Sequence, residues 1–559
     1  MIDDRTTYTR CTQRWEALKQ ERSPWLSHWS EIGGVLLPRS GKFLSGRDSN
    51  RGGKRNQKIY DNTATRALRV LAAGMMAGMT SPARPWFRLA TADKALMEYG
   101  PVKEWLNDVT ELMRDIFQRS NTYRSLHQVY EELGAFGTGC SIITGDYRRV
   151  IHHTTLTAGE YCIATNHLGE VSTLYRELEM SVASMIERFG RKKCSDSVRN
   201  MYDRGQLDSW VTVIHAIDPH QYRDLSKRDN RNMPYMSVYF EAGKGCEEPL
   251  SVSGFRRFPA IVPRWFQAAQ DIYGSSPAMD ALGDINQLQH EQLRKAQAID
   301  YQTKPPLQAP ISMQFRDINS LPGGVTFVDG MQTASIKSQF EVNLNLQHLL
   351  LDIEDVRDRI RSAFYSDLFL MLANDTRSGI TATEIAERHE EKMLMLGPVL
   401  ERLNNEMLDP MIDIVFAQIV ESGLLPPPPQ EMQGHEINVQ FVSMLAQAQQ
   451  AVGLSSISRL LGTVGAVAQM QPSALDKLDG DQLIDKASDM LGVDPTLILA
   501  DDKVAIIRAE RAKQQQAMQQ AAMMQQGVAM AKQASETDTA QKNALTDVMG
   551  MFSGYGGMQ

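Results

Sequence analysis

Cysteine is scarce in this chain of 559 residues, and its five cysteines are scattered and odd in number. They are Cys11, Cys140, Cys162, Cys194 and Cys246, and no two of them form a CxxC pair. Because cysteine-based zinc sites and disulfide frameworks rely on regularly spaced cysteines, the sequence predicts neither. Such scattered thiols are typical of a protein from a reducing cytosol.

Long apolar runs are also missing. The first ten residues, MIDDRTTYTR, contain no apolar segment of the kind that a secretory signal needs. The longest purely apolar runs, such as residues 368–373, fall far short of the roughly 20 residues that span a bilayer. We therefore expect no secretory signal and no membrane as a partner.

An excess of positive charge is absent as well, because 67 Asp and Glu oppose 59 Lys and Arg, for a net charge of −8. A protein that grips nucleic acid neutralises its phosphates, and this requires a clear basic excess. The balance argues against such a protein. It does not exclude one through which DNA merely passes.

Catalytic and ligand-binding motifs are missing too. Gly53-Lys54 lacks the upstream glycine of a P-loop, His389 has no HExxH partner, and no GxSxG occurs. Gly137–Gly139 lacks the third glycine of a dinucleotide fingerprint, and residues 476–481 lack the Gly and Glu of a calcium loop. His152-His153 has no partner at metal-ligand spacing and is interpreted as a strand-end pair. The sequence thus predicts no enzyme, no cofactor and no metal.

The segment from residue 59 to residue 89 is the most informative part of what is present. Ala, Gly and Met alternate without charge from Leu71 to Met79, which predicts a helix that another backbone can approach closely. The helix should stop at Ser81-Pro82, and Pro85 should hold Trp86-Phe87 in an extended segment. From these properties alone, a buried core helix followed by a turn is the simplest interpretation.

Hydrophobic periodicity predicts helices before and after this segment and a β-rich region behind them. The helices are expected in the first 36 residues, at 101–120 and at 125–136, with a basic, Gly-rich loop at 38–53. Within a β-rich subdomain at 140–270 the expected strands are 140–144, 161–165, 171–176, 210–217 and 236–241, with a hairpin turn at 166–169 and short helices at 183–189 and 196–202.

The centre of the chain shows two amphipathic helices around a non-helical stretch. Ser276 as N-cap and Pro277 at the first position predict a helix to about residue 301. Helix returns at 343–364, with His348, Asp352, Asp355 and Arg359 on its polar side. A predicted loop over 365–379 follows.

A long helix over 381–422 should come next, begun by a capping box at Thr381 and Glu384 and kinked at Pro398 and Pro410. Further expected elements are a strand at 437–441, short helices over 443–500, a Gln/Ala/Met-rich helix over 501–534 and a disordered end from 553.

Three short motifs in residues 59–89 resemble the N-terminal signature of portal proteins, the head-to-tail connectors of short-tailed double-stranded DNA bacteriophages. These motifs are Asp61-Asn62-Thr63-Ala64, Leu71–Met75 and Ser81–Phe87. Residues 379–385 (GITATEI) are similar to the family's motif after its tunnel loop. Residues 474–508 resemble its crown segment. The matches together span about residues 1–530, and the departures lie in the clip and at the C-terminus.

The resemblance implies a mainly helical α+β fold, the phage portal fold. Its expected parts are a wing (1–275, including the β-rich subdomain), a first stem helix (276–302), a clip (303–342), a second stem helix (343–364), a tunnel loop (365–380), a kinked wing helix with a return strand (381–442), a helical crown (443–500), a C-terminal helical barrel (501–552) and a disordered tail (553–559).

The family also implies a function and partners. The chain would form a homo-oligomer, a dodecameric ring at one capsid vertex of the virion, assembled in the host cytoplasm. Double-stranded DNA would pass through its channel during packaging and ejection without sequence-specific binding. The terminase large subunit, a tail adaptor protein, and the major capsid and scaffold proteins would dock on the ring.

Two sets of residues would then meet the DNA. The polar face of residues 343–364 would point at the channel or at a neighbouring subunit, with a solvated helix face bearing i,i+4 ion pairs as the alternative. In the tunnel loop the polar residues Asn374, Asp375, Thr376 and Arg377 would face DNA, while the apolar residues 368–373 would pack against neighbours. A helical extension buried in the monomer is the alternative for that apolar stretch.

Two other function classes compete. The chain could be another helical virion protein, such as a scaffold-like or ejected internal protein. The β-rich insertion and the Pro-rich stretch between paired helices argue against this class. A nuclease would need clustered carboxylates, but Asp146, Glu160 and Asp218 stand at no motif spacing. DNA cleavage dependent on Mg²⁺ would distinguish a nuclease from the other two.

Overall fold

The structure is a computed structural model, and it describes most of the chain. The described residues are 4–43, 57–93, 96–97, 99–227, 229–243, 248–303, 307–308, 337–338, 347–373, 396–432, 434, 437–441, 460–465, 480–484 and 501–535. The chain forms two compact units. The first comprises Met1–Leu89, Asp108–Pro427 and Val439–Leu475, and the second comprises Ala90–Asn107, Pro428–Asn438 and Asp476–Gln559.

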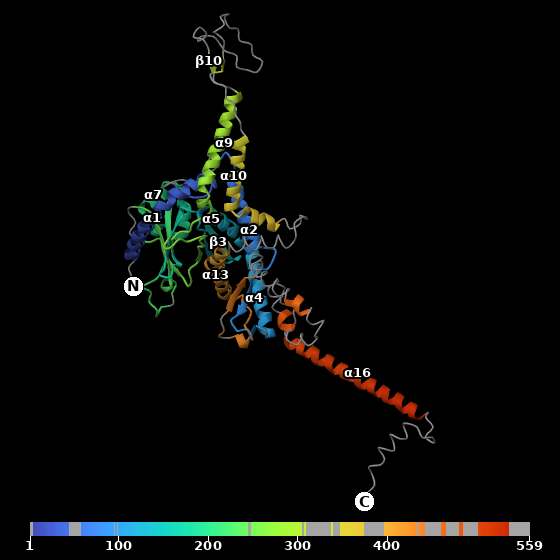
Figure 1. The fold of residues 1–559 in the computed structure, drawn as a ribbon. Coiled ribbons are helices and arrows are strands. Elements are labelled where there is room, and N and C mark those ends of the chain that lie inside the picture. The colour runs from blue at the N-terminus through green and yellow to red at the C-terminus, as the bar shows by residue number, and fades with distance from the viewer. Residues whose placement is uncertain are drawn as a thin grey trace. The chain divides into compact units, whose positions relative to one another are not determined.

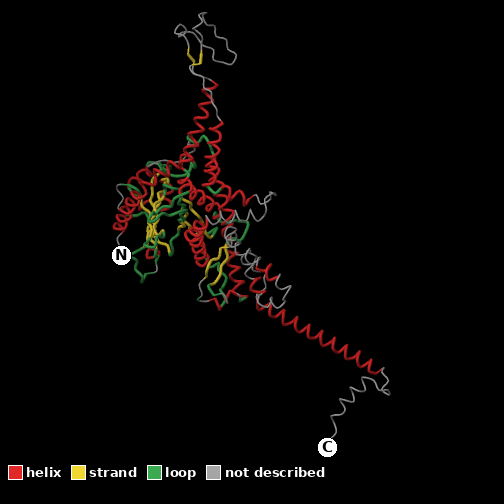
Figure 2. The backbone as a smooth tube through the Cα atoms, viewed as in Figure 1, coloured by secondary structure: helices red, strands yellow, loops and turns green. Residues whose placement is uncertain are grey.

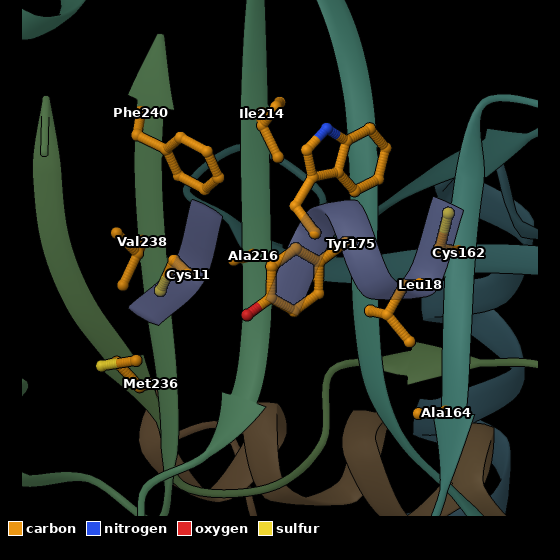
Figure 3. Close-up of a cluster of buried hydrophobic side chains, with 11 residues drawn as sticks. Cys11, Leu18, Cys162, Ala164, Tyr175, Ile214, Ala216, Met236, Val238 and Phe240 are labelled. Atoms are coloured by element: carbon orange, nitrogen blue, oxygen red, sulfur yellow. The ribbon is translucent and has the colours of Figure 1, made fainter. Parts of the chain in front are cut away.

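An antiparallel five-stranded sheet forms the β-rich part of the first unit, and helix α1 (Asp4–Val35) packs on one of its faces (Figure 1). Cys11, Trp15 and Leu18 recur on one side of α1 and are buried against the sheet. Figure 3 shows this layer, in which Tyr175, Ile214 and Phe240 come from the strands. The strands, in spatial order, are β4 (Tyr161–Thr165), β5 (Val171–Ser181), β6 (Trp210–Pro219), β7 (Tyr235–Glu241) and β8 (Ser251–Phe255).

The opposite face of the same sheet is covered by two short helices, α6 (Val182–Phe189) and α7 (Asp196–Asp203). Val213 of β6 belongs to this second cluster, whereas its neighbour Ile214 belongs to the first. Successive strand residues point to opposite faces, so both faces of the sheet are buried.

A smaller three-stranded sheet has the order β3-β2-β9 and also lies in the first unit. Figure 2 shows the strands of the chain in yellow among its helices in red. Its strands are β2 (Cys140–Asp146), β3 (Val150–Leu156) and β9 (Ala260–Ile261). All five predicted strands and the turn at 166–169 are confirmed, while β3, β8 and β9 were not predicted. His152 and His153 lie inside β3, so their interpretation as a strand-end pair was wrong.

The predicted small-residue helix is α2 (Thr63–Met79), and it is a core helix. Leu68, Leu71 and Met75 are buried, and α2 packs on α5 (Thr122–Phe136). A Cβ placed on Gly134 of α5 would lie 2.6 Å from Leu68 Cδ1, so a larger residue here would force this leucine side chain to shift.

The predicted aromatic anchor follows α2. Trp86 is buried and its ring stacks on Phe117 of α4 (Gly100–Arg119), with centroids 5.8 Å apart. Phe87 begins β1 (Phe87–Thr91), which pairs with β12 (Ile437–Phe441), the strand predicted at 437–441.

The two amphipathic helices of the centre lie side by side as α9 (Leu282–Thr303) and α10 (Gln347–Ala363) (Figure 1). A short helix, α8 (Pro277–Asp280), precedes α9, and the predicted cap is confirmed because Met279 N donates to Ser276 Oγ at 3.0 Å. Between α9 and α10, the described residues include one antiparallel pair, β10 (Leu307–Gln308) and β11 (Lys337–Ser338). Most of the predicted clip lies outside the described residues.

The first half of the predicted tunnel loop is a helix instead, α11 (Ser366–Ala373). Tyr365 adopts a left-handed backbone with φ 54°, and this turns the chain between α10 and α11. Leu368 and Phe369 are buried, and Phe369 covers Gly74 of α2. Packing within the chain therefore explains Leu368 and Phe369, as the helical alternative proposed, whereas Leu370 is exposed. The loop prediction was wrong for residues 366–373.

The predicted kink near Pro410 corresponds to one wider turn of helix. Residues 396–403 are helical, Asn404–Leu408 form a π-turn, and α13 (Asp409–Glu421) continues the helix. Proline has no N–H to donate, and a π-turn accommodates the missing bond. Gly423, with φ 68°, follows the helix end at the predicted place. The predicted capping box at Thr381 and Glu384 lies outside the described residues.

In the second unit the main helix is α16 (Asp501–Ser535), close to the predicted range of 501–534. Arg508 Nη1 pairs with Asp481 Oδ2 at 2.6 Å and ties the helix to residues 480–484. Across the described residues, every helix is either too short or too polar to cross a bilayer.

Candidate functional site

Helices α9 and α10 are joined by buried apolar residues, here called the apolar seam, and by an ion pair. Ile285 and Leu288 of α9, together with Ile353 and Val356 of α10, are buried. Outside this seam, Arg359 on α10 pairs with Asp284 Oδ1 of α9 at 3.0 Å. The two helices are therefore joined by both kinds of contact.

The predicted polar face of α10 is only partly available to a partner. Arg359 Nε also contacts Asp355 Oδ2 at 3.3 Å, one helical turn away. These two residues thus form the i,i+4 pair that the solvated-face alternative predicted. His348 and Asp352 are exposed. Orientation of this face toward a channel stays a prediction.

Asp61 is the point at which the segment before α2, α9 and α10 meet, a role that the sequence did not reveal. Its carboxylate accepts bonds from Thr63 N at 2.8 Å, Arg357 Nη2 at 2.8 Å and Gln292 Nε2 at 3.1 Å. Gln289 of α9 completes the joint: its Oε1 accepts from Asp61 N at 2.9 Å, and its Nε2 donates to Asp61 O at 2.8 Å.

This joint keeps Asp61 ionised although it is only 8% exposed. Burial acts to raise the pKa of the carboxyl, but hydrogen bonds from Thr63 and Arg357 outweigh it, and the pKa lies below its usual value. The Asp-Asn-Thr-Ala motif therefore holds α9 at Gln289 and Gln292 and α10 at Arg357. This part of the helix pair is called its root.

Several large apolar side chains on α9 and α10 are exposed. They are Ile299 and Tyr301 on α9 and Leu350 and Leu351 on α10. Exposed apolar side chains gathered on one helix pair are typical of surfaces that another protein covers.

The predicted DNA-facing residues of the tunnel loop, Asn374, Asp375, Thr376 and Arg377, lie outside the described residues. The chain reaches them from α11. Their role stays a prediction.

A buried ion pair joins the β-rich part of the first unit to the π-turn. Arg264 is 2% exposed, and its Nη2 lies 2.7 Å from Glu406 Oε1. The backbone N of Arg264 donates to Glu406 Oε2 at 2.9 Å, and its Nη2 donates to the carbonyl of Gly169 at 2.8 Å. The partners are 142 residues apart, so no local sequence pattern could reveal the pair.

No group of three or more metal-ligating side chains gathers within the part of the chain that the structure describes. The contacts of Asp61 and the pair Arg264–Glu406 join structural elements of the first unit.

Comparison with known proteins gives the family context. The family described as "Bacteriophage head to tail connecting protein" matches residues 8–499. A probable portal protein of Bordetella phage BPP-1 is 58% identical over 97% of this chain and 98% of its own length. The portal protein of Salmonella phage epsilon15 is 45% identical over the same shares of the two chains.

Matches among solved structures include chains from gene transfer agent particles. One, from the virion of the native particle, is 12% identical with a TM-score of 0.35. Another, from the neck of the native particle computed with C12 symmetry, is 13% identical with a TM-score of 0.34. Each alignment covers 78% of this chain and 91% of the other.

Proposed function

Because the chain belongs to the family of bacteriophage head-to-tail connecting proteins, we propose that it acts as a portal ring through which double-stranded DNA enters and leaves the capsid. The observation that carries the proposal is the near full-length identity with two portal proteins, 58% and 45%. The ring is a dodecamer at the head–tail junction of the virion, assembled in the host cytoplasm.

The α9–α10 pair supplies the wall of the channel in this proposal. Its ends carry the exposed apolar residues Ile299, Tyr301, Leu350 and Leu351, which a neighbouring subunit would cover. The exposed polar residues His348 and Asp352 then remain for the lumen. A net charge of −8 on each subunit disfavours tight DNA binding and so favours sliding.

The remaining parts follow the family plan. Residues 303–342 form the clip, 443–500 the crown and 501–552 the C-terminal barrel. Asn374, Asp375, Thr376 and Arg377 narrow the channel. The terminase large subunit, the tail adaptor, and the major capsid and scaffold proteins dock on the outside of the ring.

Electron microscopy of the purified protein tests the proposal directly. End-on views should show a ring of subunits with an open central hole, and classification of those views should give its rotational symmetry. Monomers or filaments under conditions in which the protein is folded would contradict the ring.

The scaffold-like or ejected internal protein is the less favoured function. Of the two relatives named above, one is a portal protein and the other a probable portal protein, and the β-rich subdomain contains a folded, two-sided sheet. We therefore retain a single proposed function.

A further inference from the structure

A basic cavity lies at the root of the α9–α10 pair. Its volume is about 1030 Å³, and it is bounded by the chain after α1, by the segment that begins α2 and by one side of α10. Five arginines line it: Arg39, Arg66, Arg69, Arg357 and Arg361. Among the described residues that line it, Asp61 is the sole carboxylate.

The charges in the cavity are not balanced from within. Asp61 is already engaged by Thr63 and Arg357. Arg361 pairs with Asp358 at 2.6 Å and with Glu354 at 3.2 Å, and both of these residues lie outside the cavity lining. Arg66 and Arg69 are exposed and stand one turn apart on α2, and no carboxylate of the described chain pairs with either of them.

The lining of the cavity is opposite in charge to the chain as a whole. It carries five arginines and one Asp, whereas the full chain has a net charge of −8. Guanidinium groups match the oxygens of phosphate through paired N–H donors. The cavity therefore has the chemistry of a polyanion site inside an acidic protein.

We propose that this cavity binds backbone phosphates of double-stranded DNA, an inference that rests on the proposed portal function. The rival occupant is an acidic segment of a second copy of this chain. Residues 476–489 are such a segment, with five Asp and two Lys. Their Asp481 is already paired with Arg508, and their excess of three negative charges is smaller than the excess of four positive charges in the lining of the cavity. Duplex DNA, whose charge is continuous, fits the cavity better.

Such a site holds DNA locally and leaves the rest of the duplex free. The acidic remainder of the protein repels DNA, so contacts to a few phosphates give a weak, salt-sensitive anchor. An anchor of this kind retains DNA that has stopped moving without preventing its translocation.

The test compares two double variants of the full-length protein. R66Q/R69Q removes two charges from the cavity, and K192Q/K193Q removes two from exposed positions of the β-rich part as a matched control. Binding of a short, fluorescently labelled duplex is measured by anisotropy between about 50 and 200 mM salt. R66Q/R69Q should bind about tenfold more weakly at the lowest salt and lower the slope of log K against log salt by about 1.8. The control should keep the wild-type slope.

Measurements of duplex binding, of stabilisation by phosphate and of ring formation identify the results that would contradict the proposal. No duplex binding by the wild type, or equal slopes for the two variants, rules out a phosphate site for DNA here. Thermal stabilisation by inorganic phosphate that R66Q/R69Q abolishes, together with an unchanged duplex slope, assigns the cavity to a free anion. If R66Q/R69Q binds DNA normally but forms no rings, the acidic segment of a second copy is the occupant. A wild type that binds DNA without forming rings contradicts the portal function and leaves the cavity assignment intact.

Discussion

Arg357 on α10 and Asp61 before α2 are 296 residues apart in the sequence, yet Arg357 Nη2 lies 2.8 Å from Asp61 Oδ2. The contact fixes α10 to the segment that begins α2, and Gln289 fixes α9 to the same residue. The helix pair is thus fixed at Asp61, α10 through the carboxylate and α9 mainly through the main chain of this residue.

Replacement of that carboxylate should loosen the joint. Asp61→Ala removes the acceptor of Thr63 N, Arg357 and Gln292, and we expect a loss of about 2–3 kcal/mol in the free energy of unfolding. Urea denaturation measures it. Asp352→Ala, at an exposed position of α10, is the control and should change stability by less than about 0.5 kcal/mol. Equal effects of the two substitutions would show that Asp61 is not the joint described here.

The buried pair Arg264–Glu406 should be the more sensitive point. Arg264→Ala leaves the half-buried charge of Glu406 without this partner, and we expect the free energy of unfolding to fall by about 3–5 kcal/mol. Glu406→Ala removes the carboxylate that Arg264→Ala leaves unpaired. The double variant should therefore lose much less free energy of unfolding than the two single variants together. Arg402→Ala is the control: Arg402 also approaches Glu406, at 3.7 Å, but its side chain is 31% exposed. If the double variant lost as much free energy of unfolding as the two single variants together, Arg264 and Glu406 would not be coupled.

Acid should destabilise the protein through His153. Burial, with a smaller effect of the neighbouring His152, lowers its pKa from 6.5 to about 4, and neither ring nitrogen has a hydrogen-bond partner. As pH falls from 6.5 toward 4, the unfolded chain takes up a proton that the folded chain does not, so about 3 kcal/mol of stability should be lost. Urea denaturation across this range measures the loss. His153→Leu should flatten the pH profile, whereas His152→Gln, at an exposed position of the same strand, should not. A profile that His153→Leu leaves unchanged would exclude this residue as the cause.

Reversal of charge on α10 tests the proposed lumen. Asp352→Lys with Asp355→Lys would place positive charge along the DNA path and should reduce the amount of DNA packaged and the completeness of ejection. Glu187→Lys with Asp208→Lys makes the same charge change on exposed positions of the β-rich part. The measurement is DNA content per particle before and after ejection. Normal packaging and ejection by the α10 variant would exclude the lumen assignment.

Local signals predicted much of the fold. Helix starts were found where the sequence carries a cap, as at Ser276, and strands where β-branched residues cluster, as in β4. Strand β3 was not predicted because its sequence, VIHHTTL, places two histidines at its centre. Helix α11 was interpreted as a loop because its apolar residues show no helical period, and the burial of Phe369 depends on its contact with Gly74 in the tertiary fold.

Functional contacts were harder to predict than elements. The polar face of α10 was identified by periodicity, but its pairing with Asp284 depends on how α9 lies beside it. The joint at Asp61 and the pair Arg264–Glu406 connect residues that only the tertiary fold brings together. Such pairs have no spacing rule in a single sequence.

The π-turn at residues 404–408 sets the direction in which the side chains of α13 point. Each residue of an α-helix advances the side-chain direction by about 100°, so one extra residue in a turn rotates all later side chains by that angle. The buried face of α13, formed by Met411, Ile412, Val415 and Ile419, faces the core only because of this offset. Deletion of a single residue from the turn would carry that face toward solvent, whereas a substitution there would leave its direction unchanged.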